Sequence, residues 1–255
     1  MSDAPRRTSP GDHFSGISSA YARFRPRYPK ALFDFIAAIA PRHRLAWDCG
    51  AGSGQATLDL TEHFDLVIAT DVSARQIAEA PAHSRITWRV APADASGISD
   101  HSVDATTVAQ ALHWFDHDRF ATEVRRVSAS DAVVVAWTYE TPFLDGDAGA
   151  ILRRYAFETV GAYWPPERRY VDEGYRTIPF PFERIDIPTL ELVDHWTRDQ
   201  LAGYMRTWSS TTRYREQHAA DPVADVEREL ANVWPDRAEA RKIVWRMPIL
   251  AGRVS

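Results

Sequence analysis

The apolar and polar residues between positions 29 and 140 alternate between two patterns. Residues 29–40 carry apolar side chains at helical spacing, which predicts an amphipathic helix that ends near Pro41. Residues 45–49 form a short continuous apolar run, which is typical of a buried strand. The same alternation predicts further helices over residues 55–63, from Ser73 to the residue before Pro81 and from Asp116 onward, and further strands over residues 66–72, 86–91, 103–110 and 132–139.

Strands and helices that alternate at this spacing predict crossover connections and therefore a parallel sheet. Because the strands are continuous apolar runs, we expect helices to cover both faces of this sheet. The fold class that follows is a doubly wound α/β fold, in which residues 143–255 supply a cap or insertion and the final strands of the same sheet. The pattern after Pro142 predicts helices around residues 148–160, 200–208 and 223–233, an aromatic, proline-rich stretch over 163–182, and strands around 184–193 and 242–250.

Composition and charge limit the classes of function. The chain has 30 Lys and Arg against 35 Asp and Glu, a net charge of −5, which disfavours a nucleic-acid binder with a strongly basic surface. Its longest apolar run, residues 132–137, is far shorter than the ~20 residues that a membrane-spanning helix needs. One cysteine permits no internal disulfide and fits a reducing compartment such as the cytoplasm. Residues 1–13 are polar and rich in Pro, Ser and Arg, and we expect them to form a flexible N-terminal tail.

A glycine-rich turn between the first predicted strand and the next helix is the sharpest local signal. The segment Asp48-Cys-Gly-Ala-Gly-Ser-Gly-Gln55 lies beyond the carboxyl end of a predicted strand, where parallel sheets bind ligands. Its spacing, G-x-G-x-G, differs from the dinucleotide fingerprint G-x-G-x-x-G, and no lysine follows as a P-loop requires. The glycines could form a tight turn without a ligand, but Asp48 before them and Asp71 at the end of the second strand favour a ligand site.

This turn resembles the first motif of class I S-adenosylmethionine-dependent methyltransferases, and three further segments are similar to one group within that class. Residues 21–29 (Y-A-R-F-R-P-R-Y-P) resemble its N-terminal signature, residues 103–116 its fourth-strand motif, and residues 207–209 a later element. The group is the type-11-like methyltransferases, which include trans-aconitate methyltransferases. The resemblance implies a mostly parallel, seven-stranded Rossmann-like methyltransferase sheet. Residues 14–142 would bind S-adenosylmethionine, and S-adenosylhomocysteine would be the product.

The resemblance also implies roles for ten residues on the cofactor side. Gly50, Ala51 and Gly52 would pass beneath the methionine part of the cofactor, and Asp48 would help to orient its ammonium group. Asp71 would accept hydrogen bonds from the ribose hydroxyls, as acids do in related nucleotide-binding folds. The adenine and the sulfonium would be bordered by Val72, Ala93, Asp94, Gln110 and Ala111.

On the substrate side, we expect Tyr21, Arg25, Trp114 and Trp208 to bind the methyl acceptor. Arg25 belongs to the densest basic cluster, residues 23–30. This cluster could be a solvated face, or Arg25 could hold an anionic substrate, since arginine binds carboxylates through two parallel hydrogen bonds. Several aromatic side chains could form the roof of a pocket, although for each one alone core packing is the commoner role; they are Trp137, Tyr139, Tyr163, Trp164, Trp196 and Trp208.

His113 is the candidate catalytic residue, because it follows the fourth predicted strand beside the expected sulfonium. It could be a general base, a hydrogen-bond positioner or a packing residue, and we favour a positioner because an acid substrate is already ionised at neutral pH. His113 and His117 have a spacing that could grip zinc, but Asp116 is a better helix cap and separates them, so we predict no metal site. Cys49 could be a nucleophile, but at the end of a buried strand it is better explained as a core residue.

These features predict an S-adenosylmethionine-dependent methyltransferase that acts on an O or N nucleophile of a small molecule. A small organic acid or a heteroaromatic metabolite is the leading substrate class. The alternative from another class is a catalytically silent regulatory protein that binds S-adenosylmethionine. We expect neither a nucleic acid nor a membrane as a partner.

Overall fold

A seven-stranded sheet forms the centre of the computed structural model, which describes residues 24–254. Its strands are β1 (Leu45–Cys49), β2 (Leu66–Asp71), β3 (Ile86–Val90), β4 (Val103–Ala109), β5 (Ser128–Trp137), β6 (Glu183–Arg184) and β9 (Ile249–Arg253). Their order is β3-β2-β1-β4-β5-β9-β6. The first five strands pair in parallel, and β9 runs antiparallel to both of its neighbours. The predicted doubly wound, mostly parallel sheet is therefore confirmed.

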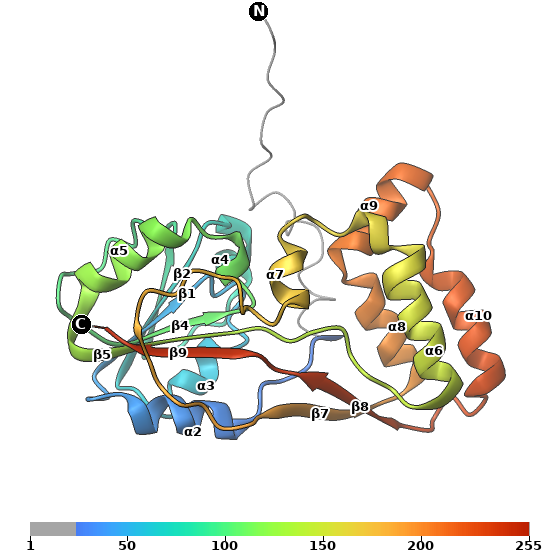
Figure 1. Cartoon of the computed structure of the whole chain (residues 1–255), viewed down its shortest axis with the longest axis horizontal. Helices are drawn as coiled ribbons and strands as arrows, with labels where there is room; N and C mark the ends of the chain where they lie inside the picture. Colours follow the sequence, from blue (N-terminus) through green and yellow to red (C-terminus); the bar gives the residue numbers. More distant parts are fainter. Residues whose placement is uncertain (1–23, 255) are drawn as a thin grey trace, which may run out of the picture.

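Helices cover both faces of this sheet, as the continuous apolar strands predict (Figure 1). One face is covered by α4 (Ala74–Glu79) and α5 (His117–Val127), and the other by α2 (Lys30–Ile39) and α3 (Thr57–Leu60).

Side chains that alternate along β5 enter two separate cores. Val134 and Ala136 pack in the cluster that contains the apolar face of α5. Val133, Val135 and Trp137 pack in the cluster that contains the apolar face of α2. All five are fully buried, so the strand is apolar on both sides.

Side-chain caps begin two of the helices where the sequence predicts them. Ser73 Oγ accepts a hydrogen bond from the backbone N–H of Gln76 at 3.3 Å, at the start of α4. Asp116 accepts one from the N–H of Arg119 at 3.2 Å, at the start of α5. The prediction of a helix over residues 55–63 is too long, because the chain leaves the α-helical pattern after Leu60 and continues in tighter turns.

The remaining elements form a second lobe beside the carboxyl ends of the central strands (Figure 1). Its strands, β7 (Glu191–Trp196) and β8 (Arg241–Arg246), make a separate antiparallel pair. The short helix α7 (Arg168–Asp172) lies between the two lobes. The other helices are α6 (Gly146–Arg154), which a π-helical turn over Tyr155–Thr159 continues, α8 (Arg198–Arg206), α9 (Ser209–His218) and α10 (Val223–Val233).

The predictions for this half need four corrections. The strand predicted around 184–193 is two strands in different sheets, β6 and β7, and the one predicted around 242–250 is also two, β8 and β9. Both interruptions contain a proline, Pro188 and Pro248, which has no N–H to donate to a strand ladder. The helices α7 and α9 were not predicted; α9 is too polar to show a clear apolar period.

The apolar core on the α2 face continues into the second lobe without a break. One cluster of buried side chains joins Phe33 of α2 and Trp137 of β5 to Trp196 and Trp245 of the β7–β8 pair. The last two rings are 4.8 Å apart, edge to face. Within the described residues, no helix is both long and apolar enough to cross a membrane.

Candidate functional site

The glycine turn after β1 takes backbone conformations that side chains would oppose. Gly50, Gly52 and Gly54 have φ angles of 72°, 58° and 97°, in the left-handed region that favours glycine. A Cβ on Gly50 would lie 2.6 Å from the Cβ of Ala111, and a Cβ on Gly54 would lie 2.5 Å from the indole of Trp88. A Cβ on Gly52 would meet nothing within 4 Å. The absence of a side chain at Gly50 and Gly54 therefore allows Ala111 and Trp88 to pack closely against the turn, whereas the space beside Gly52 is open.

A cavity of about 670 Å³ opens beside this turn, at the carboxyl ends of β1, β2, β3 and β4. Its volume lies within the usual range for small-molecule sites, about 300–1,000 Å³. Of the ten residues that the sequence assigns to the cofactor, all except Asp48 line this cavity: Gly50, Ala51, Gly52, Asp71, Val72, Ala93, Asp94, Gln110 and Ala111.

Asp71 forms one wall of the cavity at the end of β2. Its Oδ2 accepts a hydrogen bond from the Gly52 N–H at 2.9 Å, and its Oδ1 accepts one from the Ser73 N–H at 2.8 Å. Burial raises the pKa of Asp71, although these two N–H donors oppose that rise. Val72, the next residue, is 52% exposed and offers an apolar surface to the cavity.

Asp48 is the one cofactor-side residue that lies elsewhere. Its side chain is fully buried beneath the turn, where it accepts hydrogen bonds from the hydroxyls of Thr57 at 2.6 Å and Thr107 at 2.9 Å. Burial raises its pKa to about 6. In this structure the Asp48 carboxylate does not line the cavity: it ties β1 to α3 and β4 through these two hydroxyls, and so supports the turn from below.

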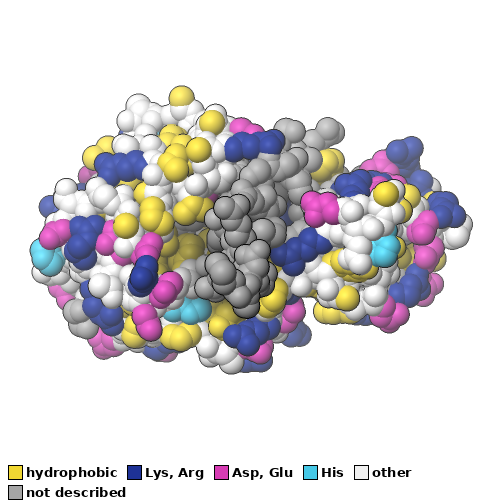
Figure 2. All heavy atoms as spheres, turned by 90° about the horizontal axis from the view of Figure 1, so that it is seen from above, with side chains coloured by type: hydrophobic (Ala, Val, Ile, Leu, Met, Phe, Trp, Pro, Cys, Tyr) yellow, Lys and Arg dark blue, Asp and Glu magenta, His cyan; other side chains and the backbone are white. Residues whose placement is uncertain are grey.

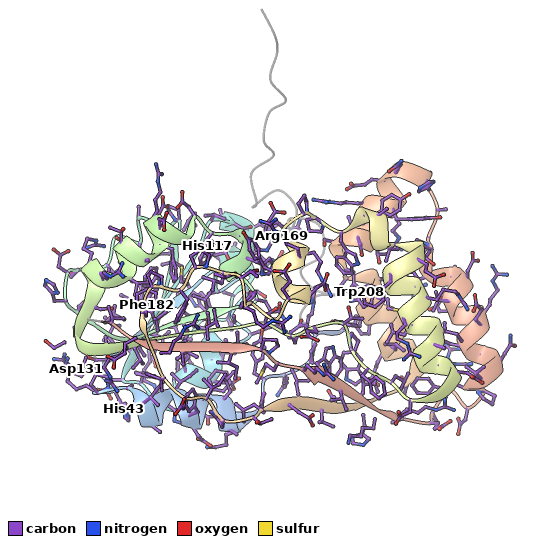
Figure 3. All side chains as sticks on the ribbon, viewed as in Figure 1. His43, His117, Asp131, Arg169, Phe182 and Trp208 are labelled. Atoms are coloured by element: carbon purple, nitrogen blue, oxygen red, sulfur yellow. The ribbon has the colours of Figure 1, made fainter. Side chains whose placement is uncertain are left out.

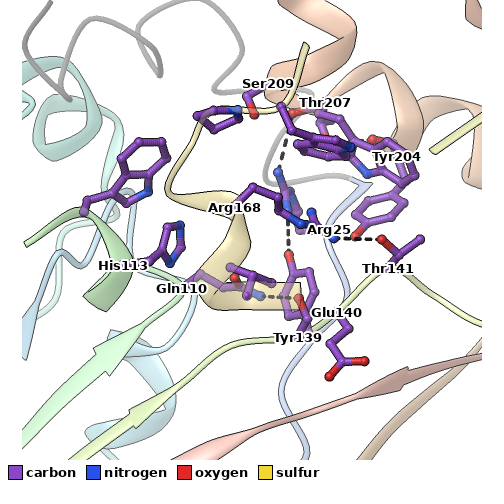
Figure 4. Close-up of a pocket in the computed structure, with 15 residues that line it drawn as sticks. Arg25, Gln110, His113, Tyr139, Glu140, Thr141, Arg168, Tyr204, Thr207 and Ser209 are labelled. Carbon is purple, nitrogen blue, oxygen red and sulfur yellow. Dashed lines mark hydrogen bonds between the residues drawn. The ribbon is translucent and has the colours of Figure 1, made fainter. Parts of the chain in front are cut away.

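A second, smaller cavity of about 90 Å³ adjoins the first, and Gln110 and Trp114 line both. Figure 4 shows it between the central sheet and the second lobe. The predicted substrate residues Arg25 and Trp208 line it, and the candidate roof residues Tyr139 and Trp164 do so as well.

Three of the candidate roof residues, Tyr163, Trp137 and Trp196, do not line this cavity. Tyr163 contacts His218, and Trp137 and Trp196 are core residues. Figure 3 shows Trp208 on the side of the second lobe. Tyr21 lies outside the described residues.

Two arginines face the small cavity from different parts of the chain (Figure 4). Arg25 donates a hydrogen bond from Nη1 to the hydroxyl of Tyr139 at 2.7 Å, and its guanidinium carbon lies 5.4 Å from the ring centroid of Tyr204. Arg168, on α7, stacks on Trp164 at 4.3 Å and is held by hydrogen bonds to Thr141 at 2.7 Å and to Asp172 at 2.8 Å. Arg168 was not among the residues predicted for the site. Its one local signal was the sequence after Trp164, where a proline pair precedes two arginines.

His113 lies in a 3₁₀ turn between β4 and α5, at the wall of the small cavity. It is 8% exposed, and its Nδ1 lies 2.8 Å from the hydroxyl of Tyr175, a second residue that the sequence analysis missed. Burial, the charge of Arg168 and the nearby His117 lower the pKa of His113 to about 3, so the ring is neutral at physiological pH.

His117 begins α5, one turn away from His113, as the predicted cap at Asp116 requires. Its Nε2 lies 3.2 Å from the carbonyl of Leu112. Within residues 24–254, no group of three or more His, Cys, Asp and Glu side chains is placed to hold a metal ion. Cys49 is 1% exposed at the end of β1, and burial raises the pKa of its thiol.

Basic and acidic side chains are interspersed on the face of the molecule that Figure 2 shows. On the face in Figure 2, Lys and Arg alternate with Asp and Glu on both lobes, and the described part of this face has no broad basic area.

Comparisons with known proteins agree with this geometry. Residues 47–136 match the model of a family described as a methyltransferase domain. A Dictyostelium discoideum protein named as a methyltransferase is 32% identical over 237 residues, which cover 91% of this chain and 90% of that protein. A solved structure from Anaeromyxobacter dehalogenans, named as a type II methyltransferase, is 43% identical, with a TM-score of 0.84 over 90% of this chain and 98% of that one. The chain therefore belongs to the class I S-adenosylmethionine-dependent methyltransferases.

Proposed function

We propose that this methyltransferase transfers a methyl group from S-adenosylmethionine to an O or N atom of a small organic acid or a heteroaromatic metabolite. The observation that carries the proposal is the pair of guanidinium groups, Arg25 and Arg168, in a small cavity that shares Gln110 and Trp114 with the larger one. A substrate in the small cavity would face the bound cofactor across these two shared residues.

The residues of the larger cavity fit S-adenosylmethionine. Gly52 leaves open space where any other residue would place a Cβ, so backbone and ligand can approach closely. Asp71 retains oxygen lone pairs for ribose hydroxyls after its two backbone bonds, and Val72 offers apolar surface to a purine. When bound there, S-adenosylmethionine supplies a methyl group on a positively charged sulfur.

The residues of the small cavity would bind and orient the acceptor. Arg168 is held by Thr141 and Asp172 through Nη2 and Nε, and no residue of the described chain takes its Nη1. That donor, together with Arg25, suits a carboxylate. Trp164 and Trp208 would pack on a planar or apolar part of the substrate and exclude water. Alignment of the nucleophile with the methyl carbon can supply about 7–11 kcal/mol of the barrier.

Within the family, we propose that this protein belongs to the group that includes the trans-aconitate methyltransferases. The motifs in residues 21–29 and 103–116 support it, and an acid-binding pair of arginines is consistent with it. We further propose that residues 14–142 hold the cofactor, and that residues 143–255 cap the substrate and complete the sheet.

The test is a methyl-transfer assay with isotopically labelled S-adenosylmethionine and a panel of small carboxylic acids, each paired with its neutral amide. In the variant Arg168→Lys, we expect the KM for a substrate acid to rise about tenfold, because lysine lacks the planar guanidinium that bonds Thr141 and Asp172 through Nη2 and Nε and leaves Nη1 for the substrate. The KM of its amide should change little. The neighbouring Arg169→Lys is the matched control, since Arg169 is exposed and its guanidinium hydrogen-bonds to and stacks on Tyr170, whose side chain does not line the small cavity. Equal effects on acid and amide, or no labelled product from any acid, would contradict the proposal.

A further inference from the structure

Gln76, on α4, has a buried side-chain amide without a hydrogen-bond partner in the described chain. The residue lines the larger cavity and is 7% exposed. Its backbone N–H bonds to Ser73 Oγ, but its Oε1 is buried without a partner, and among residues 24–254 none accepts a hydrogen bond from its Nε2. A buried polar group without a partner costs free energy, since it has given up its bonds to water. An amide in this position is therefore better explained by a ligand in the cavity than by the stability of the chain.

The topology of the sheet places Gln76 at the end of the larger cavity that is remote from the methyl acceptor. The strand order β3-β2-β1-β4 puts β2 and β3 on one side of β1 and β4 on the other. The small cavity joins the larger one at Gln110 and Trp114, which follow β4, so the reacting sulfur would lie on the β4 side. The helix α4 follows β2 and packs against β2 and β3. Gln76 would therefore face the nucleoside end of the cofactor.

The neighbouring side chains at this end of the cavity leave the polar edge of a base without a partner of its own. Residues 91–93, which follow β3, carry no polar side-chain group. Asp94 lies 3.4 Å from a guanidinium nitrogen of Arg119, and Arg75 is paired with an acid of its own helix. Gln76 is thus the buried polar side chain that remains available to the base.

The amide of glutamine is complementary to one edge of adenine. Along that edge the 6-amino group donates a hydrogen bond and N7 accepts one, and a glutamine side chain can satisfy both at once. Rotation of the amide about its last bond exchanges the positions of oxygen and nitrogen, so the partners decide which atom faces which. Gln76 can therefore turn Oε1 to the amino group and Nε2 to the ring nitrogen when the base is bound.

We propose that Gln76 selects the adenine base of the cofactor: its Oε1 accepts a hydrogen bond from the 6-amino group, and its Nε2 donates one to N7. The inference rests on the proposed placement of S-adenosylmethionine in the larger cavity, and it names the residue that distinguishes the base. A 6-oxo base presents two acceptors on this edge, so one of them must face the amide oxygen without a bond. Because the amide is buried, that missing bond is costly.

Stability and affinity should respond differently when the amide is removed. Gln76→Met keeps a side chain of similar length and helix propensity, but it removes the polar groups that have no partner in the free protein. The free energy of unfolding in urea, measured without ligand, should therefore stay the same or rise. The affinity for S-adenosylhomocysteine should nevertheless fall about tenfold, because two hydrogen bonds to the base are lost. A residue that only packs in the wall would not produce this combination.

The test is isothermal titration calorimetry with three ligands: S-adenosylhomocysteine, its 6-oxo analogue S-inosylhomocysteine, and its 7-deaza analogue, in which a carbon replaces N7. The wild type should bind S-adenosylhomocysteine about tenfold more tightly than either analogue. Gln76→Met should weaken the binding of S-adenosylhomocysteine much more than that of the analogues, so the preference for it should narrow. Gln217→Met makes the same exchange at an exposed position of α9, and this control should match the wild type with all three ligands.

The outcomes separate this inference from the proposed function. A wild type that binds either analogue as tightly as S-adenosylhomocysteine, or a Gln76→Met variant that keeps the full preference, would overturn the inference. A Gln76→Met variant that does not fold would also overturn it, because the free protein would then depend on the amide. The titrations contain no methyl acceptor, so a failure to methylate any acid would end the proposed function and leave the role of Gln76 intact. A wild type that binds no S-adenosylhomocysteine would overturn both.

Discussion

The burial of a neutral His113 makes a quantitative prediction about stability and pH. Its pKa is lowered from 6.5 to about 3 by burial, by the charge of Arg168 and by His117. Between these values the unfolded chain binds a proton at this position and the folded chain does not, so the stability that His113 contributes rises with pH across the window. It is fully present above the unfolded pKa and is lost as the pH falls toward 3. The slope is about 1.4 kcal/mol per pH unit, or about 2–3 kcal/mol between pH 6.5 and pH 4.5.

The perturbation that isolates this contribution is His113→Asn. An asparagine side chain can keep a hydrogen bond to the Tyr175 hydroxyl, but it does not titrate. Other shifted groups, such as Asp48, Asp71 and Glu123, contribute to the pH dependence of both proteins and cancel in the difference. The difference between the unfolding free energies of wild type and variant should therefore shift in favour of the variant as the pH falls.

The assay is urea unfolding, followed by tryptophan fluorescence, at several pH values between about 7 and 4.5. A constant offset between the two proteins reports the packing change at the site and does not bear on the prediction. A difference that stays constant across the whole range would refute the reasoning, because it would mean that His113 titrates alike in the folded and unfolded chains.

Two further predictions concern the larger cavity and its turn. Asp71→Ala should weaken the binding of S-adenosylhomocysteine by about 1.5–3 kcal/mol, because a charged acceptor at the end of β2 is lost. Isothermal titration calorimetry measures this affinity, and an unchanged value would show that Asp71 does not bind the ligand. Gly54→Ala should lower the unfolding free energy by about 1–3 kcal/mol, because its φ is 97° and its Cβ would meet Trp88 at 2.5 Å. Gly97→Ala, with a φ of 68° and open space around it, should cost less in the same urea unfolding experiments, and equal losses would show that backbone strain alone acts.

The sequence predicts the parts of the fold that depend on local chemistry. The caps at Ser73 and Asp116 hold the helix starts in place through bonds within three residues, so local sequence suffices to locate them. The buried strands and the glycine turn are predicted for the same reason. The breaks at Pro188 and Pro248 have an equally local signal, since proline has no N–H for a strand ladder, and the two long predicted strands were wrong at these positions.

The site is predictable only as far as its residues sit on those local elements. Nine of the ten cofactor-side residues lie at strand ends that a parallel sheet brings together, and they line the cavity. Asp48 does not, because two threonines from α3 and β4 fix where its carboxylate points. Arg168 reaches the small cavity, and Tyr175 reaches His113 from the core, through the packing of α7 and the turn after it, which depends on residues far away in the sequence.

Because the apolar core continues from the sheet into the second lobe, we expect neither the sheet nor the second lobe to be stable without the other. Phe33 and Trp137 share one buried cluster with Trp196 and Trp245, so a cut between the lobes would expose large rings on both sides. Neither half is then expected to fold alone. A truncated chain that ends after β5 would expose to solvent the apolar side chains on the α2 side of the sheet that the second lobe covers, and it would tend to aggregate. For the same reason, chemical unfolding of the whole chain is expected to proceed in one cooperative transition that both lobes enter together.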